Sequence, residues 1–254
     1  MVDKLHNYKL KVAYNGAPFC GFARQPGQLT VQGELERALK IALRCDVETV
    51  CAGRTDAGVH ALGQVVNFLC EDEGLANRSF LRSLNALTHE QISISEVVEV
   101  DADFSSRFSA VSREYHYYIC NSETPPIFVK DFSWHIAKPL NIDAMFEASR
   151  HLIGEHDFKS FCMAVSAVDK TTMRCVNEIS FSEEKFFGEK LLCLKVVGNA
   201  FLHSMVRTIV GTLANVGKGK RNPLWVADVL AACDRQAAGE NAPAKGLVFW
   251  NVNY

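Results

Sequence analysis

Apolar and polar positions along the chain follow two periods. Alternation over short runs predicts strands, and apolar residues three and four positions apart predict helices. In the first hundred residues these patterns predict strands at 8–14, 47–52, 64–70 and 92–100, and helices at 31–43 and 78–87. In the rest of the chain they predict strands at 114–120, 132–136, 175–181, 191–197 and 247–254, and helices after Asn141, at 202–216 and at 224–233.

Both halves of the chain have the order strand, helix, strand, strand, helix, strand, allowing for insertions. This order predicts an α+β fold of two similar ferredoxin- or RRM-like halves. We expect the halves to share a central, mostly antiparallel sheet with helices on one side and an active-site cleft between them. The expected domains are 1–106 and 107–254.

The composition is that of an ordinary globular protein. The 254 residues are 48% hydrophobic and 22% charged, and no apolar run is long enough to span a bilayer. The first residues have no apolar signal core, so we expect a cytoplasmic protein with no membrane association. The nine cysteines are scattered and never form a Cys-x-x-Cys pair, so we expect no structural metal.

The net charge of −2 does not indicate a non-specific nucleic-acid binder, but the charges are unevenly distributed. Residues 4–33 and 199–227 contain lysines and arginines but no acidic residue. If these segments meet in space, they form a positive groove. Alternatively, they are unrelated solvated faces.

The segment Cys51–His60 places the carboxylate of Asp56 on a predicted loop, beside Arg54 and between Gly53 and Gly58. Reactive groups often lie on such loops, because the flanking strands hold them in place. The competing interpretation is a turn, in which the aspartate bonds its own backbone.

Two further segments carry candidate chemistry. In 112–119, Tyr115 and Tyr117 point to one strand face, which indicates either a stacking platform for unpaired bases or an aromatic filler of a half-buried sheet. In the predicted helix 202–216, His203, Arg207 and Gly211 share a face away from the apolar stripe. Arg207 there is suited to a carboxylate or a phosphate, or is a plain surface arginine.

The segment containing Asp56 resembles the catalytic loop of the TruA family of tRNA pseudouridine synthases. Four further blocks resemble the family in the same order, at 107–117, 154–161, 201–211 and 242–247. One difference is Phe22, in Gly21-Phe-Ala-Arg-Gln25, where the family often has Trp.

This resemblance implies the isomerisation of uridine to pseudouridine at positions 38, 39 and 40 of the tRNA anticodon stem-loop. The reaction gains and loses no atom and needs no cofactor. This agrees with a chain that has no nucleotide, flavin or metal motif. The partners implied are tRNA and a second copy of the chain.

The resemblance also implies roles for individual residues. Asp56 is the catalytic carboxylate and Arg207 its ion-pair partner. Tyr115 packs against the target uracil and moves a proton, Leu247 walls the uracil pocket, and Arg54 fills the gap left by the flipped nucleotide or grips its phosphate. The further RNA-contact candidates are Arg24, His203, Lys218 and Lys220.

Two other classes of protein remain open at this point. One is a catalytically silent RNA-binding module, against which the intact Asp56 argues. The other is a metal-dependent hydrolase using Asp56 and His60, which needs a third ligand and usually a helix for this spacing.

Overall fold

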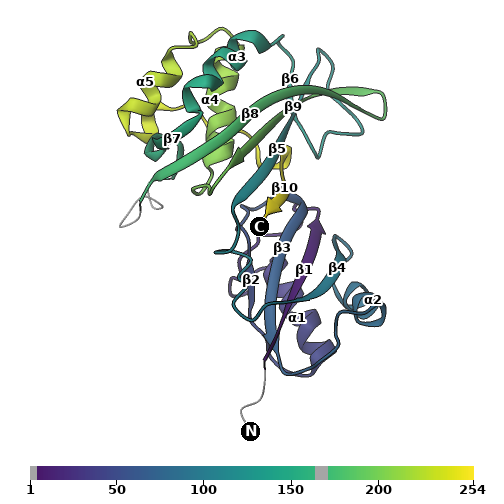
Figure 1. The fold of residues 1–254 in the computed structure, drawn as a ribbon. Helices are drawn as coiled ribbons and strands as arrows, with labels where there is room; N and C mark the ends of the chain where they lie inside the picture. The colour runs from purple at the N-terminus through teal and green to yellow at the C-terminus, as the bar shows by residue number, and fades with distance from the viewer. Residues whose placement is uncertain (1–4, 164–170) are drawn as a thin grey trace. The chain divides into compact units, whose positions relative to one another are not determined.

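The computed structural model describes residues 5–163 and 171–254, and its chain divides into two compact units (Figure 1). Unit 1 comprises Met1–Val111 and Phe249–Tyr254, and unit 2 comprises Ser112–Val248. Both contain strands and helices, which confirms the α+β class. Within the described ranges, no helix is long and apolar enough to cross a membrane.

Unit 1 has the predicted order of elements. They are β1 (His6–Tyr14), α1 (Val31–Leu43), β2 (Thr49–Cys51), β3 (His60–Cys70), α2 (Arg78–Leu87) and β4 (Ile92–Val100). Strand β1 lies between β3 and β4, β2 pairs with β3, and all these pairs are antiparallel. The helices start where side chains cap them: Thr30 accepts from the amide of Gly33, and Asn77 accepts from the amide of Phe80.

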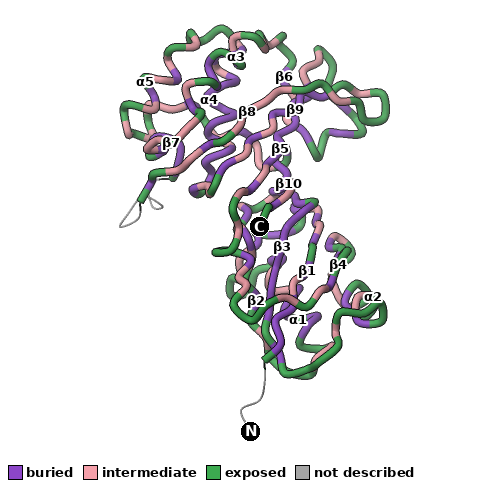
Figure 2. Tube along the Cα trace, in the orientation of Figure 1, coloured by how far each residue is buried: buried purple, intermediate pink, exposed green. Residues whose placement is uncertain are grey.

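The core of unit 1 lies along β1, which Figure 2 shows as largely buried. Its even-numbered residues Tyr8, Leu10 and Val12 are fully buried, and Leu35 and Leu39 form the apolar stripe of α1. Alternation in the strand and the 3.6-residue period in the helix therefore supply the two faces of one core.

Unit 2 is built on an antiparallel sheet in the order β5–β9–β8–β7, and the short β6 pairs parallel to β5. Its elements are β5 (Ser112–Asn121), β6 (Trp134–Ile136), α3 (Ile142–Ser149), β7 (Gly154–Asp157), β8 (Met173–Phe186), β9 (Glu189–Gly198), α4 (Met205–Gly217) and α5 (Trp225–Ala232). Short 3-10 turns lie at Arg150–Leu152, Lys159–Phe161, Arg235–Ala237 and Ala244–Gly246. Phe146 of α3 meets Phe181 of β8 edge to face, so the helices pack on one face of this sheet.

The last strand, β10 (Leu247–Asn253), begins in unit 2 and ends in unit 1. Its final residues are fixed to unit 1 through the amide of Val111, which donates to the carbonyl of Asn253 at 2.8 Å. The ring of Tyr254 packs on Phe104, and its hydroxyl donates to the carbonyl of Ser106 at 3.0 Å. The chain therefore returns to unit 1 after completing unit 2.

Three sequence predictions need correction. The helix expected to begin at residue 202 begins at Met205, because Ser204 adopts a left-handed conformation with φ of 61° that no helix accommodates. Strand β3 begins at His60, four residues earlier than expected, so His60 is a strand residue. Strand β7 was not predicted, because Gly154–Asp157 is short and polar and pairs only at the sheet edge with β8.

Candidate active site

The loop that carries Asp56 joins β2 to β3 in unit 1, and its first two residues are hydrogen-bonded to β3. The amide of Ala52 donates to the carbonyl of Val65 at 2.9 Å. The side-chain amide of Gln64, which is fully buried, donates to the carbonyl of Gly53 at 2.7 Å. The loop therefore leaves the sheet on a fixed path.

Thr55 fixes the middle of the loop through two hydrogen bonds to residues outside the loop. Its hydroxyl shares a 2.7 Å hydrogen bond with the hydroxyl of Tyr14, and its carbonyl accepts from the amide of Phe22 at 3.0 Å. Burial raises the pKa of Tyr14, so its hydroxyl keeps its proton. Gly58 has a φ of 77°, and the amide of Val59 donates to the carbonyl of Asp56 at 3.2 Å, which closes a turn around the carboxylate. Asp56 thus stands on a rigid turn, and its side chain is half-buried.

The segment 16–22 lies directly against this loop. A Cβ on Gly16 would collide with the carbonyl of Val59, and one on Gly21 would lie 3.1 Å from the carbonyl of Thr55. The ring of Phe22, at 1% exposure, is in the core beside Tyr14. The difference from the family's Trp at this position therefore concerns packing beneath the loop.

Arg54 and Arg24 are both exposed cations of unit 1, but they differ in what they contact. The charge of Arg54 acts on the thiol of Cys51, whose pKa burial raises to about 11 and Arg54 partly lowers. Arg24 donates to Glu36 at 2.9 Å, and Glu36 is nearly buried under hydrogen bonds from Thr49 and Gln32. Arg24 therefore neutralises a buried carboxylate, a contact that the sequence did not predict.

In unit 2, strand β5 carries the tyrosine row as the alternation predicted. The ring of Tyr115 is 7% exposed and meets Phe201 edge to face at 5.1 Å between centroids. Tyr117, on the same face, is fully buried, and its hydroxyl donates to the carbonyl of Pro243 at 2.8 Å. His116 and Tyr118 pack against each other on the opposite face.

Arg207 lies in the first turn of α4 and is half-buried. Its Nε donates to the carbonyl of Ala242 at 2.8 Å, and the amide of Ala242 donates back to the carbonyl of Arg207 at 3.0 Å. This reciprocal pair fixes the base of the guanidinium. The charge of Arg207 also acts on the Tyr117 hydroxyl, so the two side chains belong to one neighbourhood.

A face of small residues on α4 receives the backbone of residues 239–242. A Cβ on Gly211 would collide with the carbonyl of Glu240, and one on Gly239 would lie 2.8 Å from Cα of Thr212. The hydroxyl of Thr208 donates to Asn241 at 2.6 Å, a contact absent from the predicted site. Its signal in the sequence was the run of small residues at 208, 211 and 212, spaced to share one helix face.

Leu247 is the first residue of β10 and is 6% exposed. The turn before it is fixed by Tyr117, since a Cβ on Gly246 would lie 2.6 Å from the Tyr117 ring. Unit 2 therefore brings Arg207, the segment 242–247 and the tyrosine row of β5 into one region.

The remaining RNA-contact candidates lie at the two ends of α4. His203 is exposed in the turn before the helix. The prediction that it shares a helix face with Arg207 is therefore wrong. After the helix, the ammonium of Lys218 lies 4.6 Å from the ring centre of Trp134, and burial and Lys220 lower its pKa. Lys220 is exposed, and so is Arg221, which lies over Trp225.

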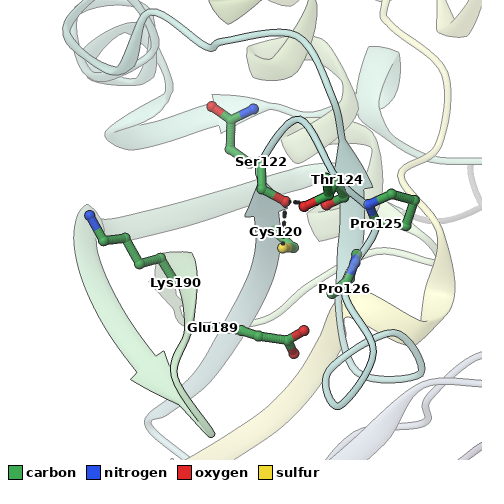
Figure 3. Close-up of a pocket in the computed structure, with 8 residues that line it drawn as sticks. Cys120, Ser122, Thr124, Pro125, Pro126, Glu189 and Lys190 are labelled. Atoms are coloured by element: carbon green, nitrogen blue, oxygen red, sulfur yellow. Dashed lines mark hydrogen bonds between the residues drawn. The ribbon is translucent and has the colours of Figure 1, made fainter.

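A pocket of unit 2 has none of these residues in its lining (Figure 3). It is lined by the end of β5, the following loop and the start of β9, including Cys120, Pro126 and Glu189. The carboxylate of Glu189 accepts the amides of Ile127, Phe128 and Val129 at 2.7 to 3.1 Å. Glu189 thus stabilises the loop at residues 127–129.

The sequence of this chain is similar to a known protein family over nearly its whole length. A family model described as tRNA pseudouridine synthase matches residues 11–109 and 148–254. Three relatives named tRNA pseudouridine synthase A come from Brevibacillus brevis, Bacillus velezensis and Francisella tularensis subsp. novicida. They are 45%, 42% and 42% identical over 96%, 97% and 98% of this chain and 97%, 98% and 95% of their own lengths. Since the match spans nearly all of the chain and includes the Asp56 loop, the protein belongs to the tRNA pseudouridine synthase family.

Proposed function

We propose that this protein isomerises uridine to pseudouridine at positions 38, 39 and 40 in the anticodon stem-loop of tRNA. The observation that carries the proposal is the Asp56 loop, whose sequence resembles the family's catalytic loop and whose backbone is fixed by Thr55, Gln64 and Gly58. A carboxylate on a rigid turn meets the first requirement of the reaction, a reactive group held in one place.

The reaction breaks the bond between N1 of the uracil and C1′ of the ribose, turns the base and joins C5 to C1′. Asp56 acts on the sugar, either as the nucleophile or as the base at C2′. The target base must leave its stack to be reached. Arg54, exposed on the same loop, is suited to fill the vacated space or to hold the neighbouring phosphate.

Unit 2 supplies the remaining proposed roles. Arg207 is the counter-charge that keeps Asp56 ionised in a water-poor site, and its reciprocal bonds with Ala242 support a fixed guanidinium. Tyr115 offers a ring to the uracil and a hydroxyl for proton movement, and Leu247 is an apolar wall.

The test of this proposal is pseudouridine mapping in tRNA treated with purified wild-type protein or Asp56→Asn. The amide is nearly isosteric but is neither a nucleophile nor a base, so we expect no product and unchanged tRNA binding. Asp103→Asn, at an exposed position of unit 1, is the matched control and should retain full activity. Activity of Asp56→Asn within tenfold of wild type, with deamidation excluded by mass spectrometry, contradicts the assignment.

We also propose that Lys218 and Lys220 after α4, and His203 before it, contact tRNA phosphates. Arg24 does so with its exposed portion. Replacing Lys220 with Ala is expected to reduce the slope of log K against log salt by about 0.9 if one phosphate contact is lost. Lys185→Ala, at an exposed position of β8, is the control. An unchanged slope removes Lys220 from the interface.

The last part of the proposal concerns assembly and location. A homodimer acting in the cytoplasm is the form implied by the family resemblance. Light scattering of the full chain at micromolar concentration tests the dimer.

A further inference from the structure

The face of the unit 2 sheet that points away from α4 carries polar, ionisable side chains. In the register of the sheet, Tyr118 of β5 lies opposite Cys193 of β9, which lies opposite Ser182 of β8. His116 and Glu184 are two residues from Tyr118 and Ser182, so they share this face. Three neighbouring strands therefore each contribute a side chain that can ligate a metal.

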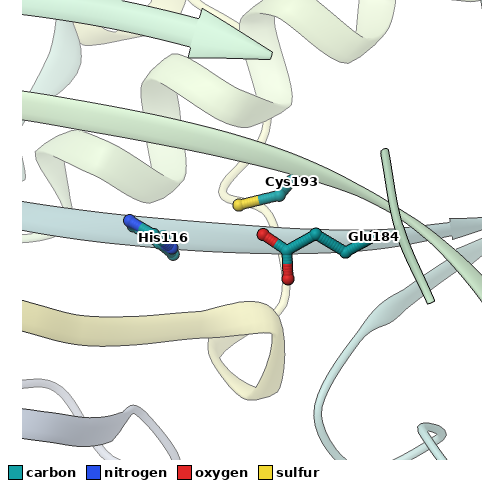
Figure 4. Close-up of side chains that lie close together, drawn as sticks. All are labelled: His116, Glu184 and Cys193. Atoms are coloured by element: carbon teal, nitrogen blue, oxygen red, sulfur yellow. The ribbon is translucent and has the colours of Figure 1, made fainter. Parts of the chain in front are cut away.

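These side chains meet at one point (Figure 4). An imidazole nitrogen of His116, a carboxylate oxygen of Glu184 and the thiol sulfur of Cys193 all lie within 4.8 Å of one another. Cys193 is 1% exposed and His116 is 9% exposed, whereas Glu184 is half-buried. The cluster is thus enclosed on the strand side and reachable from solvent on the side of Glu184.

A second carboxylate orients the histidine. Glu114 lies 2.7 Å from Nε2 of His116, and the Tyr118 hydroxyl lies 3.5 Å from Nδ1. When Nε2 donates to Glu114, the lone pair is on Nδ1. A carboxylate that fixes the tautomer of a histidine in this way is the usual outer partner of a metal-bound imidazole.

We propose that His116, Glu184 and Cys193 form a Zn²⁺ site that ties β5, β8 and β9 together. Nitrogen, sulfur and carboxylate oxygen are the donor types that zinc takes in proteins. Tetrahedral coordination with bonds of about 2.0 to 2.3 Å places ligand atoms about 3.3 to 3.8 Å apart, so small rotations of the side chains close the site. The Tyr118 hydroxyl, which hydrogen-bonds Glu184 and Cys193 and lies 3.5 Å from Nδ1 of His116, is the fourth polar group at the site.

Without a metal the thiol keeps its proton. Burial and the neighbouring Glu184 raise the pKa of Cys193 to about 12. Coordination forms the Zn–S bond, and the thiol proton leaves to solvent. Its ligands come from three strands of one sheet in unit 2, so its proposed role is to stabilise that sheet.

The test is Zn²⁺ titration of the chelator-treated full chain in competition with a chromophoric chelator, together with Co²⁺ absorption spectra. We expect one Zn²⁺ per chain, a thiolate-to-cobalt charge-transfer band and a higher Tm with Zn²⁺. Cys193→Ser should bind at least tenfold more weakly and lack the band. Cys120→Ser, a buried cysteine on β5, should behave as wild type.

Glu184→Gln is the second variant, because a half-buried position tolerates this isosteric change if Cys193→Ser does not fold. Weaker zinc binding by Glu184→Gln supports the site. The proposal is overturned if wild type shows no thiolate–cobalt band, or if Zn²⁺ affinity and stoichiometry are the same in wild type and the folded variants. Pseudouridine formation should be unaffected in Glu184→Gln, which separates this result from any failure of the proposed function.

Discussion

The position of the Arg207 side chain is fixed by the backbone around it. Its Nε is held by the carbonyl of Ala242, and Ala242 is held in turn by the carbonyl of Arg207. The guanidinium carries three nitrogens in one plane, and Nε donates to this carbonyl. Lysine has a single nitrogen and cannot reproduce this planar set of donors.

Arg207→Lys should therefore lower the single-turnover rate with saturating tRNA by at least tenfold, or about 1.4 kcal/mol of transition-state stabilisation. Quench-flow detection of pseudouridine measures this rate. Arg221→Lys, an exposed arginine stacked on Trp225, is the control and should retain the wild-type rate. A wild-type rate for Arg207→Lys would assign the counter-charge role to another group, Arg54 first.

Tyr115→Phe should impair the rate more than the affinity for tRNA. The ring and its edge contact with Phe201 remain, while the hydroxyl is lost. Binding assays and single-turnover rates of Tyr115→Phe and Tyr115→Leu separate the two roles, since leucine should lose both. If the phenylalanine variant turns over at the wild-type rate, Tyr115 serves only as a platform.

At the scale of elements, helix α4 uses one face to form the core and another to pack against residues 239–242. Val206, Ile209, Val210 and Leu213 are buried in the core. The second face carries the small residues Thr208, Gly211 and Thr212. Their size lets the backbone of residues 239–242 pack against the helix and contact Arg207. A glycine in a helix normally costs about 1 kcal/mol relative to alanine, and here it is required by the backbone that covers it.

Gly211→Ala should consequently destabilise the protein by about 1–3 kcal/mol, the opposite sign from helix propensity. The new Cβ would collide with the carbonyl of Glu240 and displace the segment that anchors Arg207. Urea unfolding monitored by circular dichroism measures the change. The control is Asn215→Ala, half-buried on the same helix, whose free energy of unfolding should stay within about 0.5 kcal/mol of wild type. If Gly211→Ala is as stable as wild type, residues 239–242 can shift to accommodate the new Cβ at little cost.

At the scale of the whole molecule, the chain does not divide into two consecutive halves. After unit 2 the last residues return to unit 1, where Phe249 is fully buried and a Cβ on Gly63 would collide with the carbonyl of Trp250. Unit 1 thus depends on residues that follow unit 2 in the chain.

Removal of residues 249–254 should destabilise unit 1 although none of its first 111 residues changes. The deletion exposes the surface that Phe249 and Tyr254 cover and leaves the amide of Val111 without its partner carbonyl. Limited proteolysis with mass spectrometry should locate new cleavage sites in residues 5–111. Tyr254→Phe, which removes the hydroxyl that bonds Ser106, should cost about 1 kcal/mol. Unchanged protease resistance after the deletion would contradict this dependence.

The sequence by itself determined the elements whose period is long and regular, such as α1, α2 and β4, whose bounds agree with the prediction. It also determined the family, because the Asp56 loop and the later blocks are local patterns. Two features depended on the tertiary structure: the start of α4, where Ser204 takes a left-handed conformation, and the short edge strand β7. Only the tertiary structure placed Ala242 against Arg207, Glu36 against Arg24, and the side chains of His116, Glu184 and Cys193 beside one another. The physical reason is that periodicity reports which face of an element is buried, whereas contacts between residues far apart in sequence depend on register and packing between elements.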